Sequence, residues 1–247
     1  MWETLLEPGR LALVGAPQRL LQGFLQELTH FAVHRQPGAV LWCDGAHSFH
    51  PEAFAELNLT RGRAADEGAD RVLVKRCMTP FQWDSTLTQH LGQKLEEADV
   101  GLVVVNPFDT LWTHEEIADW EQEDYTRFSV RHLHGVARRH KVPILLGVDI
   151  DRWWATHPVL AKTTVEAVDS RWTVTAPDGR WKAVRDDGLE LDPSLRRQVT
   201  LLDYVEEPLL VQAQRPRKDA PRAPVPGKDW DRRPWRTRIV HPVRQST

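Results

Sequence analysis

Short apolar runs alternate with longer amphipathic stretches over about the first 150 residues, and this alternation constrains the fold more than any other feature. Five runs have the length of a buried strand: 11–14, 39–43, 72–74, 100–105 and 144–148. Parallel strands need crossover connections, which are usually helices. The pattern therefore predicts a doubly wound α/β fold with a mainly parallel sheet covered on both faces.

The stretches between the runs show helical periodicity. In 18–34, apolar residues recur at spacings of three and four: Leu20, Leu21, Phe24, Leu25, Leu28, Phe31 and Ala32. We expect Asp84 to cap a second helix that continues through Leu95, and a third helix to span 114–140. These segments supply the expected crossovers.

The pattern changes after about Val168. In 172–181, alternating residues flank a Pro-Asp-Gly turn, which predicts an antiparallel extension of the same sheet, and 199–202 is a candidate for a further strand. From 212 to 247 six prolines are interspersed with arginines and little apolar material. We therefore expect a core domain over 1–211 and an extended Pro/Arg-rich tail over 212–247.

Charge and composition narrow the class of protein. The formal net charge of the 247 residues is −3, but 213–247 holds ten Lys/Arg and three Asp, so this tail is +7 and the rest −10. The longest apolar run is too short to cross a bilayer, and no signal-peptide pattern is present. With only Cys43 and Cys77, we expect a cytoplasmic protein with two buried thiols.

Two segments carry a family resemblance. The run 11–22, Leu-Ala-Leu-Val-Gly-Ala-Pro-Gln-Arg-Leu-Leu-Gln, precedes a helix, and 40–52 ends in Asp-Gly-Ala-His-Ser-Phe-His-Pro-Glu. Together they resemble the RecA/RadA recombinase superfamily, and the segment order is similar through about residue 205. The resemblance implies a RecA-like fold, with a phosphate-binding loop after the first strand.

The residues that this chemistry needs are absent from the matching positions. A loop of the G-x-x-x-x-G-K-[ST] type holds phosphates with backbone N–H groups, a lysine and a magnesium-bound hydroxyl. Alignment on Gly15 places Leu20 at the second glycine, Leu21 at the lysine and Gln22 at the hydroxyl residue. Ala46 falls on the family's catalytic glutamate and Asn106 on its magnesium-supporting aspartate. We therefore expect a pseudo-ATPase without cofactor or metal. The alternative is an unrelated doubly wound fold.

Two regions are candidates for nucleic-acid binding. By the resemblance, Arg152, Trp153 and Trp154 lie near the family's DNA-contacting loops, where they would stack on bases or else pack a loop against the sheet. The tail combines arginines with an aromatic residue in Arg232, Arg233, Trp235, Arg236 and Arg238. Such a tail would bind phosphates, or dock on an acidic protein surface, including that of its own chain.

Carboxylates form two further candidate sites. The acidic segment 114–124 is interpreted as a solvated helix face or a docking surface for a basic partner, with a metal site as the alternative. Asp149 and Asp151 follow a predicted strand and would form a nuclease-like cluster with Asp44 and Asp99.

These features favour a non-catalytic accessory or adaptor protein in DNA repair or recombination. The partner would be another protein, such as a RecA-like recombinase or repair factor, with DNA bound through the basic tail and no membrane involved. The Phe-x-x-Ala element through which the family's recombinases polymerise does not occur in the sequence. The alternatives are a KaiC-like regulatory scaffold without DNA binding and a metal-dependent nuclease.

Overall fold

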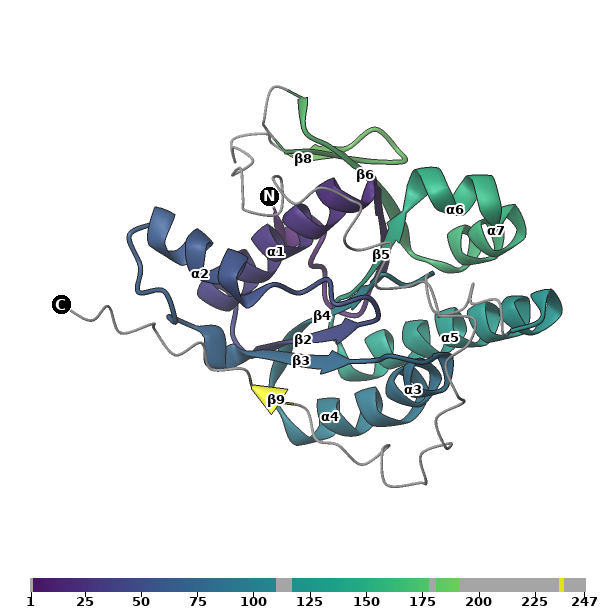
Figure 1. Cartoon of the computed structure of the whole chain (residues 1–247), viewed down its shortest axis with the longest axis horizontal. Coiled ribbons are helices and arrows are strands. Elements are labelled where there is room, and N and C mark those ends of the chain that lie inside the picture. The colour runs from purple at the N-terminus through teal and green to yellow at the C-terminus, as the bar shows by residue number, and fades with distance from the viewer. Residues whose placement is uncertain (1, 110–116, 178–180, 192–235, 238–247) are drawn as a thin grey trace, which may run out of the picture.

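A computed structural model describes residues 2–109, 117–177, 181–191 and 236–237. The described strands form one sheet in the order β8-β7-β6-β1-β5-β4-β2-β3-β9 (Figure 1). Their bounds are β1 (Leu11–Ala16), β2 (Ala39–Asp44), β3 (Val72–Arg76), β4 (Val100–Asn106), β5 (Ile144–Asp149), β6 (Ser170–Thr175), β7 (Lys182–Arg185), β8 (Glu190–Leu191) and β9 (Arg236–Thr237). Strands β1 to β6 pair in parallel, whereas β7, β8 and β9 pair antiparallel with their neighbours.

Helices cover both faces of the sheet. The described helices are η1 (Trp2–Thr4), α1 (Gln18–Arg35), α2 (Pro51–Thr60), η2 (Ala69–Arg71), α3 (Pro80–Ser85), η3 (Thr86–His90), α4 (Leu91–Glu97), α5 (Asp119–His140), α6 (Ile150–Thr156) and α7 (Pro158–Ala167). In Figure 1, α1 and α2 lie on one face and α3, α4 and α5 on the other. Buried side chains form one apolar cluster under α1 and another under α5, into which α6 and α7 also pack.

The predicted α/β architecture is confirmed. Each of the five apolar runs forms a strand, the first helix spans almost the predicted range, and the hairpin β6–β7 extends the sheet antiparallel. Both cysteines are buried, as expected. The turn residues 178–180, the candidate strand 199–202 and the domain boundary at 211 lie outside the described residues. In the described part, no helix is long and apolar enough to cross a membrane.

Two predicted helix starts are wrong. Asp84 does not cap a helix, because it lies inside α3, which begins at Pro80. The Thr79 hydroxyl accepts a hydrogen bond from the Gln82 N–H at 3.2 Å, and Pro80 occupies the first position, where proline is favoured. The third helix begins at Asp119 rather than at 114, after the non-helical Ile117, although 114–116 lie outside the described residues.

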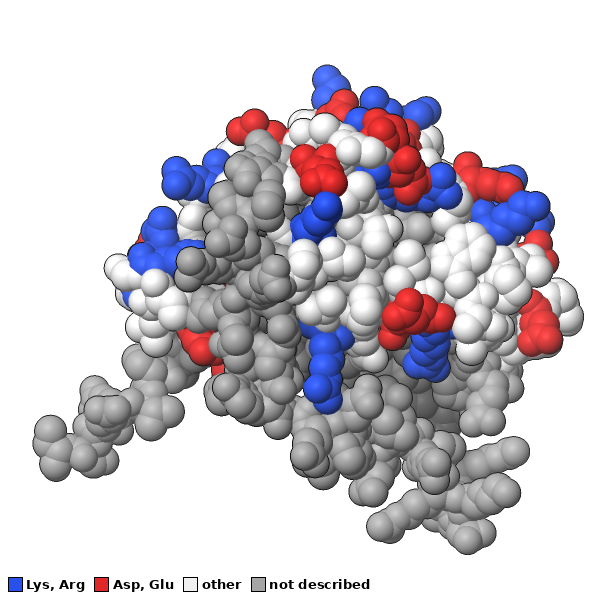
Figure 2. Space-filling view, turned by 90° about the horizontal axis from the view of Figure 1, so that it is seen from above, with Lys and Arg blue, Asp and Glu red and all other residues white. Residues whose placement is uncertain are grey.

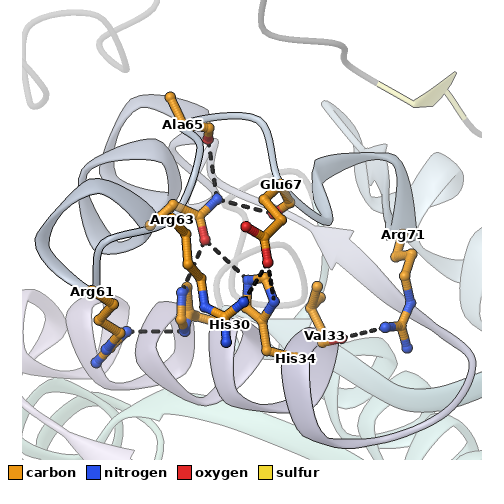
Figure 3. A network of polar contacts seen from close by, with 9 residues as sticks. His30, Val33, His34, Arg61, Arg63, Ala65, Glu67 and Arg71 are labelled. Carbon is orange, nitrogen blue, oxygen red and sulfur yellow. Dashed lines mark hydrogen bonds and ion pairs between the residues drawn. The ribbon is translucent and has the colours of Figure 1, made fainter.

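A buried polar network fixes α1 against α2 (Figure 3). The Asn58 side-chain oxygen lies 3.0 Å from Nε2 of both His30 and His34, and its amide nitrogen donates to the carbonyls of Ala65 and Glu67. Burial, together with the charge of Arg61, lowers the pKa of His30 to about 3. His30 is therefore neutral in the folded protein and donates to Asn58 through Nε2.

The carboxyl end of α1 is capped by one arginine. The Arg71 guanidinium donates to the carbonyl of Gln36 at 2.6 Å and to that of Gly38 at 3.0 Å, and it also contacts the Val33 carbonyl (Figure 3). The last carbonyls of a helix have no partner within the helix, so a planar cation with five N–H groups satisfies several at once.

We expect Arg71→Ala to lower the free energy of unfolding by about 1.5–3 kcal/mol, because carbonyls at the end of α1 lose a charged donor. Urea denaturation followed by circular dichroism measures this loss. Arg35→Ala, which removes an exposed arginine from the same helix end, is the control and should change stability by less than about 0.5 kcal/mol. Equal effects of the two substitutions would show that Arg71 does not cap α1.

Candidate functional site

The carboxyl edge of the sheet contains a crevice beside β1 and β5. The chain leaves β1 through α1 on one face toward β2, and it leaves β5 through α6 on the other face toward β6. Adjacent strands whose connections leave on opposite faces create the crevice in which α/β proteins bind ligands. The fold thus brings the ends of β1, β4 and β5 together where a nucleotide would be expected.

The connection from β1 to α1 consists of Pro17 alone. Strand β1 ends at Ala16 and α1 begins at Gln18, so Leu20, Leu21 and Gln22 are helical residues rather than loop residues. Pro17 has no N–H to offer an anion. The Leu21 N–H already donates to the Pro17 carbonyl at 3.0 Å. A phosphate cradle needs consecutive free N–H groups in a loop, and this connection is too short to supply them.

Two of the aligned positions have clear packing roles. Leu21 stands at the position of the family's lysine. Its side chain is 1 % exposed and lies in the apolar core. At Gly15, an added Cβ would come within 2.8 Å of Ile150 Cδ1. A larger residue at this position would therefore force the Ile150 side chain of α6 to move, independently of any phosphate.

The crevice narrows to a small cavity. It is lined by Gln18, Leu21, Gln22, Asn106, Pro107, Asp109, Asp149 and Arg152, and its volume is about 10 Å³. That volume accommodates about one water molecule, whereas cavities for nucleotide-sized ligands measure roughly 300–1,000 Å³. The structure therefore brings Leu21, Gln22 and Asn106 together as the resemblance implies, but Leu20 and Ala46 do not line the cavity.

The cavity is rich in acceptor oxygens. Asn106 ends β4 and is 1 % exposed, and its side chain occupies the space left by the missing Cβ of Gly147. Among the described residues, Asn106 Oδ1 and Asp109 Oδ1 have no hydrogen-bond partner. Burial raises the pKa of Asp109 to about 7; the Asp149 carboxylate also raises it, and Arg152 lowers it. Asp109 was missed in the sequence, although it follows a predicted strand by only a few residues.

The loop after β2 is organised by Asp44. This carboxylate is buried and accepts hydrogen bonds from the Ser48 N–H at 2.6 Å and the Ser48 hydroxyl at 3.0 Å. Arg76 Nε lies 3.4 Å from its second oxygen. The Ser48 hydroxyl also lies 3.2 Å from the Asn106 carbonyl, which ties the loop to β4. Ala46, at the position of the catalytic glutamate, offers only a methyl group here.

The predicted nuclease-like carboxylate cluster is wrong. Asp99 precedes β4 and its carbonyl accepts from the Ala39 N–H at the start of β2, so it lies at the amino edge of the sheet. Asp44 is engaged by its own loop, and Asp149 caps α6 by accepting from the Arg152 N–H at 3.3 Å. In the part of the chain that the structure describes, no three His, Cys, Asp or Glu side chains gather to hold a metal ion.

The candidate nucleic-acid residues separate into three groups. Trp153 is 1 % exposed and packs edge-on against Phe108 at 6.5 Å between ring centroids, so this ring is a core residue and is not available for stacking. Arg152 and Trp154 are exposed on α6, with Trp154 43 % exposed. In the tail, Arg236 belongs to β9, whereas Arg232, Arg233, Trp235 and Arg238 lie outside the described residues.

Comparison with known proteins adds no relative. A scan against protein-family models and a search of curated proteins both gave no match. The RecA resemblance therefore depends on the residues and their order alone.

The protonation of Asp109 provides a pH-dependent test. Its folded pKa of about 7 exceeds the unfolded value of 3.8, so the folded state binds the extra proton and stability is lost as pH rises from about 4 to 7. We expect the stability of Asp109→Asn relative to the unmodified protein to increase by about 2–3 kcal/mol from pH 5 to pH 8. Urea unfolding at both pH values measures this change.

Asp70→Asn, at an exposed carboxylate in η2, is the matched control for the loss of one charge. Parallel stability curves for Asp109→Asn and the unmodified protein would contradict the buried, protonated state of Asp109.

Proposed function

We propose that this protein is a non-catalytic RecA-like accessory or adaptor protein that acts in DNA repair or recombination through a protein partner and through its basic tail. The observation that carries the non-catalytic part is the connection of β1 to α1 through Pro17 alone. The process is taken from the family resemblance of 11–22 and 40–52.

The chemistry of the crevice supports the loss of nucleotide hydrolysis. Magnesium-triphosphate chemistry requires backbone N–H groups and a lysine at the phosphates, a hydroxyl and a carboxylate at the metal, and a residue that orients water. Here a helical turn replaces the loop of N–H groups, and Leu21 replaces the lysine. Gln22 and Asn106 stand at the metal-binding positions and Ala46 at the water-orienting position. The cavity at these positions has a volume of about 10 Å³, which is too small for a triphosphate.

DNA contact would depend mainly on the tail. On the face seen in Figure 2, Lys and Arg side chains lie next to Asp and Glu side chains rather than forming a field of one sign. The excess positive charge is concentrated in 213–247, whose net charge is +7. Arg152 and Trp154 on α6 provide an exposed cation and ring for a second contact.

A second candidate function is a regulatory scaffold of the KaiC-like type without DNA binding. Strand β9, which belongs to the tail, pairs with the edge strand β3 at Val74 and Leu73. A tail that is used by its own sheet is less available to nucleic acid, and this observation favours the scaffold.

Fluorescence anisotropy with labelled single- and double-stranded DNA over a salt series distinguishes the two functions. The adaptor function predicts binding that weakens steeply with salt. Replacing Arg232, Arg233 and Arg238 by alanine in the full chain should make the negative slope of log binding constant against log salt concentration shallower by about 2–3, because about three phosphate contacts are lost. Arg35→Ala on α1 is the control. Absence of binding at low salt would exclude DNA contact and favour the scaffold.

A further inference from the structure

The helices α3 and α5 form a groove on the face opposite α1, and it shares no lining residue with the small cavity at the crevice. It has a volume of about 320 Å³ and is lined by Asp84, Trp120, Glu121, Asp124, Tyr125 and Phe128. We call it the acidic aromatic groove. In Figure 1, α5 extends past α3, and the residues of the groove come from the amino-terminal turns of α5 and from α3. The sequence pointed to part of it through the acidic segment 114–124.

The groove exposes apolar surface that a soluble protein normally covers. Trp120 is 68 % exposed and Phe128 is 58 % exposed. With Asp124 they follow each other at intervals of four residues, so the three side chains share one face of α5. On α3, Phe81 is 76 % exposed and lies three residues from Asp84. Exposed aromatic clusters of this kind mark interaction surfaces.

The charge of the groove restricts its occupant. Three carboxylates line it, and the nearest described cation to Asp124 is Arg127, at 3.9 Å, which also pairs with Glu123. Exposed rings beside carboxylates favour a ligand that carries both arginines and an aromatic or apolar anchor, since guanidinium groups pair with carboxylates and stack on rings. The occupant is therefore basic and aromatic.

We propose that residues 229–235 of this same chain, Asp-Trp-Asp-Arg-Arg-Pro-Trp, occupy the acidic aromatic groove. This segment lies outside the described residues, and it carries the required chemistry in Arg232, Arg233 and two tryptophans. The tail is +7 and the rest of the chain −10, so the two parts attract each other.

The pairing of β9 with β3 shows in which direction the preceding tail residues run. Strand β9 runs antiparallel to β3, with Arg236 beside Val74 and Thr237 beside Leu73 (Figure 1). The residues that precede Arg236 are therefore directed toward the carboxyl end of β3, after which the chain enters α3 and reaches Asp84. Seven extended residues reach about 23 Å, which exceeds the roughly 9 Å length of α3. Segment 229–235 is thus attached through β9 to β3, the strand that leads into α3 and the groove.

Docking within one chain has a functional consequence. A tethered segment experiences an effective concentration in the millimolar range, so weak contacts suffice to hold it. Arginines that pair with the groove are not free for phosphates, so docking and DNA contact compete for the same side chains. The docking itself does not depend on the adaptor function, because it involves only this chain.

Hydrogen exchange of the full-length protein, without DNA, tests the proposal. We expect the amides of 229–233 and 235 to be protected in the unmodified protein, and Asp124→Lys to reduce that protection by about tenfold. The double tail variant Arg232→Glu/Arg233→Glu should have the same effect. Combining all three substitutions should restore part of the protection, because Lys at 124 can then pair with the introduced glutamates, whereas Asp84 and Glu121 stay acidic. Glu96→Lys, at an exposed carboxylate on α4 outside the groove, should leave protection unchanged.

Several outcomes would overturn the proposal. These are the absence of protection in the unmodified protein, an equal effect of Glu96→Lys, or a triple variant in which the losses add instead of cancelling. Protection that increases with protein concentration would place the tail on a second copy and would also contradict docking within one chain. Thermal unfolding of each variant shows whether the fold is retained, and Trp120→Ala, which removes the ring and keeps every charge, should also reduce protection.

Discussion

The close junction of β1 with α1 is the constraint on which the rest of the carboxyl edge depends. Because only Pro17 separates them, α1 begins directly over the sheet and Leu21 enters the core. Next to this junction, Gly15 packs against Ile150 of α6, so elements from both faces meet at this point. The crevice that the topology creates is thereby closed to a cavity of about 10 Å³. Packing interactions fill the positions at which the resemblance implies phosphate chemistry.

The remaining polar residues at this edge stabilise the fold. Asp44 and Ser48 fold the loop after β2 onto the end of β4, and Asp149 caps α6. These hydrogen bonds explain why the pattern around 44–52 resembles a catalytic segment without any carboxylate at position 46. On the surface, α3 and α5 present aromatic and acidic side chains, and β9 covers the edge strand β3.

Local patterns predicted the elements better than the contacts between them. The apolar runs gave five strands because buried parallel strands are continuous in hydrophobicity. The prediction of Asp84 as a cap is wrong because Thr79 and Pro80 start the helix earlier, and the sequence pattern alone does not rank these two possible starts. Trp153 and Trp154 are neighbours in sequence, yet the helix directs one into the core and the other outward. The cavity at Asp109, the amino-edge position of Asp99 and the acidic aromatic groove all depend on strand order and helix packing, which periodicity does not specify.

The most direct test of the central claim is isothermal titration of the full-length protein with ATP in excess Mg²⁺. The closed junction at Pro17 predicts no saturable binding at nucleotide concentrations up to about 1 mM, equivalent to less than about 4 kcal/mol of binding free energy. A saturable isotherm with a dissociation constant in the micromolar range, lost when Mg²⁺ is chelated, would contradict the account and show that the crevice opens to hold a nucleotide.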